Sequence, residues 1–179
     1  NNTNNNLKDK ILQQAPSEWN GYDTIITEPT DLRNLKLSKI IKKGKFLILK
    51  NPGVLFNKNK ITIKFHFDVM HKSGNLKKAV NLINNNDKSE FIDYINDNTS
   101  LHSWNLLCCN SKILLNDWYS TIFEWLFKCE KIFGFDQLSG YETGRIYAYL
   151  AERYLPFWFK KYSKVRTWPI YFHDNTNKF

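Results

Sequence analysis

The sequence lacks any apolar stretch close to the roughly 20 residues that span a bilayer. Its amino terminus also lacks the charged and apolar regions of a secretory signal. It contains only three cysteines, and two of them, Cys108 and Cys109, are adjacent, where a mutual disulfide would be strained. We therefore expect a reducing compartment and a cytoplasmic location, which leaves room for peripheral contact with the inner face of the cytoplasmic membrane.

Several motifs of well-known enzyme classes are also missing. The sequence has no glycine-rich phosphate loop, no GxSxG elbow and no HExxH pair. Its cysteines and histidines lack the spacing of metal ligands, so we predict no metal site in this chain. It also has no Asp-x-Asp pair, which nucleotide-sugar transferases of the commonest fold use to hold a divalent ion on the donor diphosphate.

The composition is that of a folded protein with many aromatic rings. The chain has 179 residues, of which 42% are hydrophobic and 24% charged, and this length fits one domain. Aromatic residues make up 16%, with 13 Phe, nine Tyr and six Trp. Most of these rings are expected in the core, but flat amphipathic rings also suit stacking on sugars or bases.

The formal net charge is +9, and the positive residues cluster at residues 36–45 and 160–166. Such a charge attracts anions, and phosphate is the partner type that we expect. Nucleic acid, a sugar-nucleotide diphosphate and an anionic membrane surface would all satisfy this field, and so would water around a basic face without a ligand. Charge alone does not choose among them.

The first half of the chain predicts short strands and short helices. We expect a disordered Asn-rich lead at residues 1–6 and a short helix at residues 7–14. The apolar runs at residues 23–27 and 46–49 are bounded by glycine and proline, which is typical of buried strands. Between them lies a basic connector, residues 33–45, which also suits a short amphipathic helix.

The middle of the chain is more helical. Residues 61–71 fit both strand and helix, and we favour a helix that ends by Gly74. Residues 76–83 and 88–95 predict two short helices, and residues 104–109 predict a strand.

The strongest periodicity comes in the last third. An amphipathic helix that ends at Gly134 is predicted by apolar residues at three- and four-residue spacing: Trp118, Ile122, Trp125, Leu126, Cys129, Ile132 and Phe133. A second helix is expected over residues 141–159, with Pro156 kinking or ending it. Its inward residues should be Ile146, Tyr149, Leu150, Tyr154 and Phe157. Residues 168–172 should form an edge strand. The sequence thus predicts one helix-rich α/β domain over residues 7–179.

One segment of the second helix carries charges that suggest chemistry. Arg145, Tyr149 and Glu152 share a helical face, and Arg153 follows directly. A carboxylate between two guanidinium groups is held ionised and fixed in orientation. It can accept the proton of an attacking hydroxyl while the cations offset charge on a departing diphosphate. The plainer alternative is a structural ion pair that ties this helix to its neighbour.

The last third also resembles a known family. Residues 109–127 (CNSKILLNDWYSTIFEWLF), the pair 130–131 and residues 145–158 follow a progression of W-L-F, E-K, R, E-R-L and W. This progression resembles that of glycosyltransferases encoded in bacterial capsule and lipopolysaccharide clusters, a family formerly described as a domain of unknown function. The similarity reaches upstream to residues 22–26 and to Phe67, His71 and the Asn75–Leu76 pair.

The resemblance implies the acceptor-side half of a GT-A-like nucleotide-sugar transferase. It implies transfer of a sugar from a nucleotide-sugar, with Mn²⁺ or Mg²⁺, to a capsule or lipopolysaccharide acceptor. The family's positions imply Glu152, Arg153 and Arg145 as catalytic residues and His71 and Asn105 as substrate-binding residues. From residue types alone, a histidine such as His71 is more often a packing residue, and Asn105 could equally satisfy local backbone groups. Tyr149, on the shared helical face, and Trp104, as a sugar platform, complete the expected substrate-binding residues.

Two other functions stay open. The family's strand-rich nucleotide-binding half has no counterpart in this sequence, so we expect it in a longer precursor or in a partner chain, unless it has been lost. Its absence also favours a non-catalytic module that binds glycan or phosphate. A nucleic-acid-binding domain is disfavoured because basic residues do not alternate closely with aromatic ones.

Overall fold

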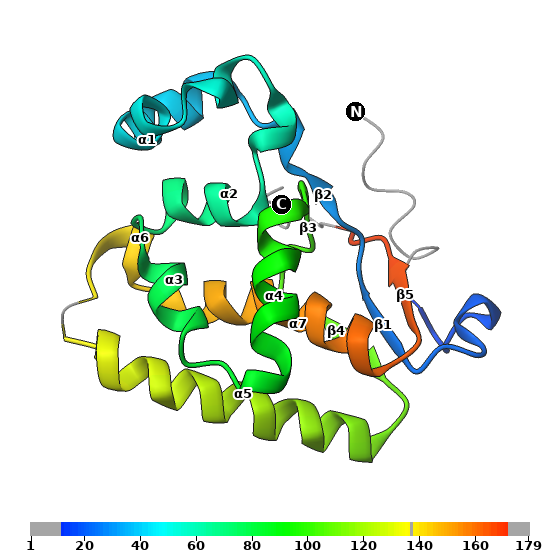
Figure 1. Cartoon of the computed structure of the whole chain (residues 1–179). Coiled ribbons are helices and arrows are strands. Elements are labelled where there is room, and N and C mark those ends of the chain that lie inside the picture. The colour runs from blue at the N-terminus through cyan, green and yellow to red at the C-terminus, as the bar shows by residue number, and fades with distance from the viewer. Residues whose placement is uncertain (1–11, 137, 172–179) are drawn as a thin grey trace, which may run out of the picture.

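The computed structural model describes residues 12–136 and 138–171. Its larger sheet has the strand order β4-β1-β5. The central strand β1 (Thr24–Thr27) is antiparallel to β4 (Leu107–Cys109) and parallel to β5 (Val165–Trp168). A second, two-stranded sheet pairs β2 (Thr30–Asp31) with β3 (Ser100–Leu101). Both sheets lie at one side of the molecule, and helices form the rest (Figure 1).

Helices make up most of the described chain. The α-helices are α1 (Leu37–Lys50), α2 (Ile63–Met70), α3 (Asn75–Val80), α4 (Asn85–Asp97), α5 (Lys112–Phe133), α6 (Gly140–Thr143) and α7 (Ile146–Tyr162). Short 3-10 helices occur at Ser17–Trp19, Leu32–Asn34, Pro52–Leu55 (η4) and Lys58–Lys60. The predicted helix-rich α/β character, with short strands and two long helices near the carboxyl end, is confirmed. No helix among the described residues is both long and apolar enough to cross a bilayer.

The helix α7 forms the centre of the hydrophobic core. It packs against α4 and α5, and it crosses the middle of the molecule (Figure 1). The five side chains predicted to point inward are all buried: Ile146, Tyr149, Leu150, Tyr154 and Phe157. The longer helix α5 begins at its N-cap, where the Ser111 hydroxyl accepts a hydrogen bond from the Leu114 N–H, and ends before Gly134 as predicted.

Pro156 was expected to kink or end the last helix, and it does not end it, because α7 continues to Tyr162. Proline lacks the N–H that would bond to the Glu152 carbonyl, which costs a helix about 3 kcal/mol. Its neighbours Leu155 and Phe157 are buried, so the core gains from a continuous helix. At its other end the predicted helix divides: α6 and α7 are separate.

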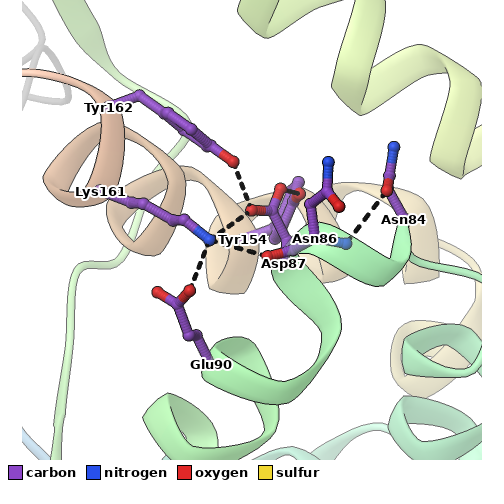
Figure 2. A network of polar contacts seen from close by, with 7 residues as sticks. All are labelled: Asn84, Asn86, Asp87, Glu90, Tyr154, Lys161 and Tyr162. Atoms are coloured by element: carbon purple, nitrogen blue, oxygen red, sulfur yellow. Dashed lines mark hydrogen bonds and ion pairs between the residues drawn. The ribbon is translucent and has the colours of Figure 1, made fainter.

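A buried carboxylate fastens α7 to α4. Asp87, at the start of α4, accepts hydrogen bonds of 2.6 Å from the hydroxyls of Tyr154 and Tyr162. The Lys161 ammonium lies 3.0 Å from the same carboxylate and 2.7 Å from Glu90 (Figure 2). Burial alone would raise the pKa of Asp87, but these three donors outweigh it and lower the pKa. The network therefore fixes the orientation of α7 against α4.

The strand predicted at residues 46–49 is wrong, because these residues lie in α1. A short apolar run fits a strand and a helix equally well, and here the flanking lysines extend a helix with one buried face. That face contains Ile40, Gly44 and Ile48 and lies on α2. A Cβ added at Gly44 would lie 2.9 Å from a methyl carbon of Val69, so glycine permits this close packing.

Other boundaries also differ from the sequence predictions. The predicted edge strand at residues 168–172 is displaced, since β5 ends at Trp168, although β5 is indeed at an edge of the sheet. Leu12, the first described residue of the helix predicted at residues 7–14, is not helical. The rest of that prediction, up to residue 11, and the Asn-rich lead at residues 1–6 lie outside the described residues.

Candidate functional site

An open cavity of about 310 Å³ lies between α1, α2, α7 and the segment that follows β3. Six of the seven residues predicted for the site line it: His71, Trp104, Arg145, Tyr149, Glu152 and Arg153. They come from three separate parts of the chain, so the fold brings together residues that the sequence places up to 82 positions apart. The seventh, Asn105, does not line this cavity.

The face of α7 predicted from helical spacing is the face that borders the cavity. Arg145 stands at the N-cap of α7, and Tyr149 and Glu152 follow at intervals of four and three residues. Such spacing stacks side chains one above another on one side of a helix. The three side chains therefore form one wall.

The carboxylate of this wall is held by a buried cation. The Arg153 Nη1 atom lies 2.7 Å from Glu152 Oε2 and also donates to the Tyr149 carbonyl at 3.3 Å. The Arg153 side chain is only 2% exposed and its guanidinium lies over the Phe67 ring. Glu152 is 14% exposed and reaches the cavity. The pair is therefore sealed on the arginine side and open to ligand on the carboxylate side.

His71 lies against Tyr149 on the floor of the cavity. The two rings stack with centroids 3.8 Å apart, and His71 Nδ1 lies 3.3 Å from the Glu142 carbonyl oxygen. Burial, then the positive charge of Arg153, lowers the pKa of His71 to about 4, so the ring is neutral at physiological pH. A neutral ring that donates from Nδ1 keeps Nε2 as an acceptor. Both rings are buried, at 5% and 6% exposed, so the stacked pair packs the inner end of this wall and borders the cavity only with its edges.

Half of the residues that line the cavity could not be predicted from the sequence. These residues are Lys39, Lys43, His66, Met70, Leu101 and Ser103. The basic cluster that contains Lys39 and Lys43 was visible in the sequence, but nothing local indicated that it would meet α7. Lys43 lies 3.5 Å from a carboxylate oxygen of Glu142. His66 is mostly buried, and its Nδ1 has no hydrogen-bond partner among the described residues.

The cavity is positive. Burial, followed by the charge of Arg153, lowers the pKa of His66 to about 3, so neither lining histidine is charged at neutral pH. The lining cations are therefore Lys39, Lys43, Arg145 and Arg153, against the single lining carboxylate of Glu152. An excess of positive charge in a concave, partly enclosed site attracts anions.

The two neighbouring residues Trp104 and Asn105 face different openings. Trp104 has a positive φ of 80°, which is unusual for a bulky residue, and its half-exposed ring borders the cavity. The Asn105 amide donates to the Ala148 carbonyl of α7 at 3.1 Å and borders an apolar groove next to it. Asn105 therefore fastens the loop to α7, while Trp104 lies at the edge of the cavity.

The lining does not fit a divalent cation. Mg²⁺ and Mn²⁺ prefer several oxygen ligands, and here one carboxylate, already paired with arginine, is surrounded by basic groups. Across the described ranges, no three His, Cys, Asp or Glu residues lie close enough together to hold a metal ion.

Comparison with known proteins gives one result that covers most of the chain. Residues 17–164 match the model of a family described as a domain of unknown function, DUF4422. No curated protein and no solved structure matches the sequence. The matched range includes both sheets except for β5, all seven α-helices and every residue of the cavity. The chain therefore belongs to the DUF4422 family.

Proposed function

We propose that the chain is the acceptor-side part of a glycosyltransferase that acts in bacterial surface-polysaccharide assembly, at the inner face of the cytoplasmic membrane. The observation that supports this most is the convergence of six predicted residues on one open, positive cavity. The resemblance of the last third of the sequence to capsule and lipopolysaccharide transferases suggests the reaction class, which is sugar transfer. We propose the cavity as the location of this reaction.

In this proposal Glu152 accepts a proton. The oxygen of an acceptor hydroxyl forms a bond to the anomeric carbon of the donor sugar, while the bond from that carbon to the diphosphate oxygen breaks. The electron pair of the broken bond leaves with the diphosphate, and the hydroxyl proton moves to Glu152. Its Oε2 atom accepts a hydrogen bond from Arg153, so in this proposal Oε1 takes the proton.

The basic residues would offset the negative charge of phosphate groups. Arg145, Lys39 and Lys43 border the cavity and carry side chains long enough to reach a phosphate oxygen. Arg153 is buried, so its role is to orient the Glu152 carboxylate through their 2.7 Å ion pair. In this proposal Glu152 takes the proton and Arg153 orients Glu152, so both of these adjacent residues of α7 would be needed.

The aromatic groups would position sugar rings. The half-exposed Trp104 ring suits stacking on the apolar face of a hexose. The buried His71–Tyr149 pair would contact a sugar only with its edges, and His71 Nε2 would accept a hydrogen bond from a sugar hydroxyl. We place the divalent ion and most of the nucleotide outside this cavity, in a donor half supplied upstream or by a partner chain, because the lining does not suit a metal. No step proposed here uses the ion.

The second candidate is a non-catalytic module that binds glycan or phosphate. One observation favours it: four lining cations face one carboxylate that is already paired, which is sufficient for anion binding without chemistry. Both functions predict ligand binding in the cavity, but only the transferase predicts turnover of a donor, so a turnover assay separates them.

The experiment measures nucleotide release and sugar transfer from UDP-, GDP- and CMP-sugars, with and without Mn²⁺, using sugar phosphates as acceptors. We expect Glu152→Gln to lower turnover about a hundredfold or more, the usual contribution of a general base. The matched control is Glu124→Gln, because Glu124 lies on α5, is 63% exposed and pairs with Lys128, and neither residue lines the cavity. Folding of each variant is checked by urea unfolding.

Three outcomes are decisive. A selective loss in Glu152→Gln supports the transferase. Unchanged turnover in a folded Glu152→Gln variant refutes the role of this carboxylate. Saturable binding of sugar phosphates, without turnover of any donor by the unmodified protein, supports the non-catalytic module instead.

A further inference from the structure

A long segment of the chain carries positive charge only. Residues 32–67 contain no Asp or Glu. The same segment contains Arg33, Lys36, Lys39, Lys42, Lys43, Lys45, Lys50, Lys58, Lys60 and Lys64. It forms α1, three 3-10 helices and the first part of α2. Of these elements, α1 lies at the opposite end of the molecule from α5 (Figure 1). Within the described residues, Lys43 and Lys64 form ion pairs with carboxylates, but Lys42 and Lys45 do not.

The same segment exposes large apolar side chains. Phe46 and Leu49 of α1 are 82% and 76% exposed, and Phe56, directly after η4, is 89% exposed. Ile41 of α1 is also exposed. Isolated exposed apolar residues are common in soluble proteins, but several within one short segment mark a surface that meets an apolar phase.

The helical geometry of α1 separates its two faces. Ile40, Gly44 and Ile48 lie on the buried face against α2. α1 is kinked at Gly44, whose φ of −116° and ψ of 27° are not helical. Phe46 and Leu49 follow the kink, and their high exposure places them on the outward side, among the lysines of the same helix. An outward surface that mixes aromatic and aliphatic residues with lysines is typical of helices that lie in a membrane interface.

We propose that this surface, formed by α1 and Phe56, docks on a membrane that contains anionic lipids. Phe46, Leu49 and Phe56 enter the boundary between headgroups and acyl chains, and lysines such as Lys42 and Lys45 contact the anionic headgroups. The aliphatic Leu49 next to the phenylalanines suits lipid better than the stacked bases of a nucleic acid. This inference rests on the surface alone and does not depend on the chemistry assigned to Glu152.

Docking through α1 also has a geometric consequence for the cavity. Lys39 and Lys43 belong to the same helix and border the cavity. A membrane-bound α1 therefore places the cavity beside the headgroup layer, within reach of a membrane-attached acceptor. Soluble ligands of the cavity would still bind to the undocked protein.

The test is flotation of the full chain with vesicles of phosphatidylcholine alone and of equal amounts of phosphatidylcholine and phosphatidylglycerol. We expect binding to the anionic vesicles only, weakened by added salt. The double variant Phe46→Ser with Phe56→Ser should bind about tenfold more weakly, because both rings would lose their apolar burial. Lys42→Gln with Lys45→Gln should weaken binding about fivefold for each charge removed.

Matched controls come from other surfaces. Ile113→Ser removes a side chain that is 77% exposed, but on α5, and Lys77→Gln with Lys78→Gln removes two exposed charges of α3. Both should leave flotation unchanged. Glu152→Gln should leave it unchanged too, so loss of catalysis and loss of docking remain distinguishable.

The proposal is overturned if anionic and neutral vesicles bind equally, or if the α1 variants and the controls behave alike. It is also overturned if the protein does not bind vesicles and light scattering shows a dimer that Phe46→Ser dissociates. A second copy of the chain would then cover this surface. Oligonucleotide binding that depends on Phe46 and Phe56, without vesicle binding, would assign the surface to nucleic acid.

Discussion

The Asp87 network allows a quantitative prediction about what holds α7 in place. The buried Asp87 carboxylate receives hydroxyl hydrogen bonds of 2.6 Å from Tyr154 and Tyr162 and an ion pair of 3.0 Å from Lys161. A hydrogen bond to a charged group contributes about 1.5 to 3 kcal/mol when water cannot replace it. Tyr154 is buried, whereas Tyr162 is half-exposed and lies next to water.

The two tyrosines should therefore differ in energy although their distances are the same. We expect Tyr154→Phe to lower the free energy of unfolding by about 2 kcal/mol and Tyr162→Phe by about 0.5 to 1 kcal/mol. Asp87→Asn weakens all three interactions at once and should cost about 3 kcal/mol. Tyr119→Phe, at an exposed tyrosine of α5, is the control and should stay within about 0.5 kcal/mol of the unmodified protein.

The pH dependence gives an independent check. Because the folded-state pKa of Asp87 is lowered from its ordinary value of 3.8, its contribution is present above that value and is lost as the pH falls through the folded-state pKa. The difference in stability between the unmodified protein and Asp87→Asn should therefore shrink below about pH 4.

The assay is urea unfolding followed by tryptophan fluorescence, since Trp118 and Trp125 lie against Tyr154. Equal losses in Tyr154→Phe and Tyr162→Phe would refute the argument that burial sets the magnitude. A loss below about 1 kcal/mol in Asp87→Asn would show that this network does not fasten α7 to α4.

Two further predictions concern buried groups. Arg153→Met should lower the free energy of unfolding by about 3 kcal/mol, because it leaves Glu152 without its counter-charge. The double variant with Glu152→Gln should lose less stability than the sum of the two single variants. A double-mutant cycle by urea unfolding measures this, and additive losses would contradict it. Burial raises the pKa of Cys129 to about 12, so an aqueous thiol reagent should label the exposed Cys108 in the folded protein and reach Cys129 only on unfolding. Mass spectrometry of the labelled peptides measures this, and labelling of Cys129 under native conditions would contradict its burial.

Much of the fold near the carboxyl end could be predicted from periodicity. In α5 and α7 the apolar residues recur along one face over many turns, so the signal is strong and local. Residues 46–49 were misassigned because four apolar residues contain too little periodicity to separate a strand from a helix. Pro156 does not end α7, although proline disfavours the interior of a helix. The burial of its neighbours Leu155 and Phe157 outweighs this local preference, and burial is a tertiary effect that the local sequence does not show.

The candidate site was predictable to a similar extent. Arg145, Tyr149 and Glu152 could be grouped because helical spacing alone places them on one face. Lys39 and His66 could not, because they reach the cavity only through the packing of α1 and α2 near α7. His71 was predicted only through the resemblance to a family. Trp104 lies at the edge of the cavity with a positive φ, a backbone conformation that residue spacing does not predict.

The central claim is that the cavity beside α7 binds phosphate-bearing sugars. Its most direct test is a calorimetric titration of sugar phosphates and nucleotide-sugars into the unmodified protein, Arg145→Gln and the control Lys78→Gln. The account predicts saturable binding that weakens about tenfold in Arg145→Gln, since a charge-assisted phosphate contact is lost, and is unchanged in Lys78→Gln. Equal affinity in all three proteins, or no binding of any of these ligands, would contradict it.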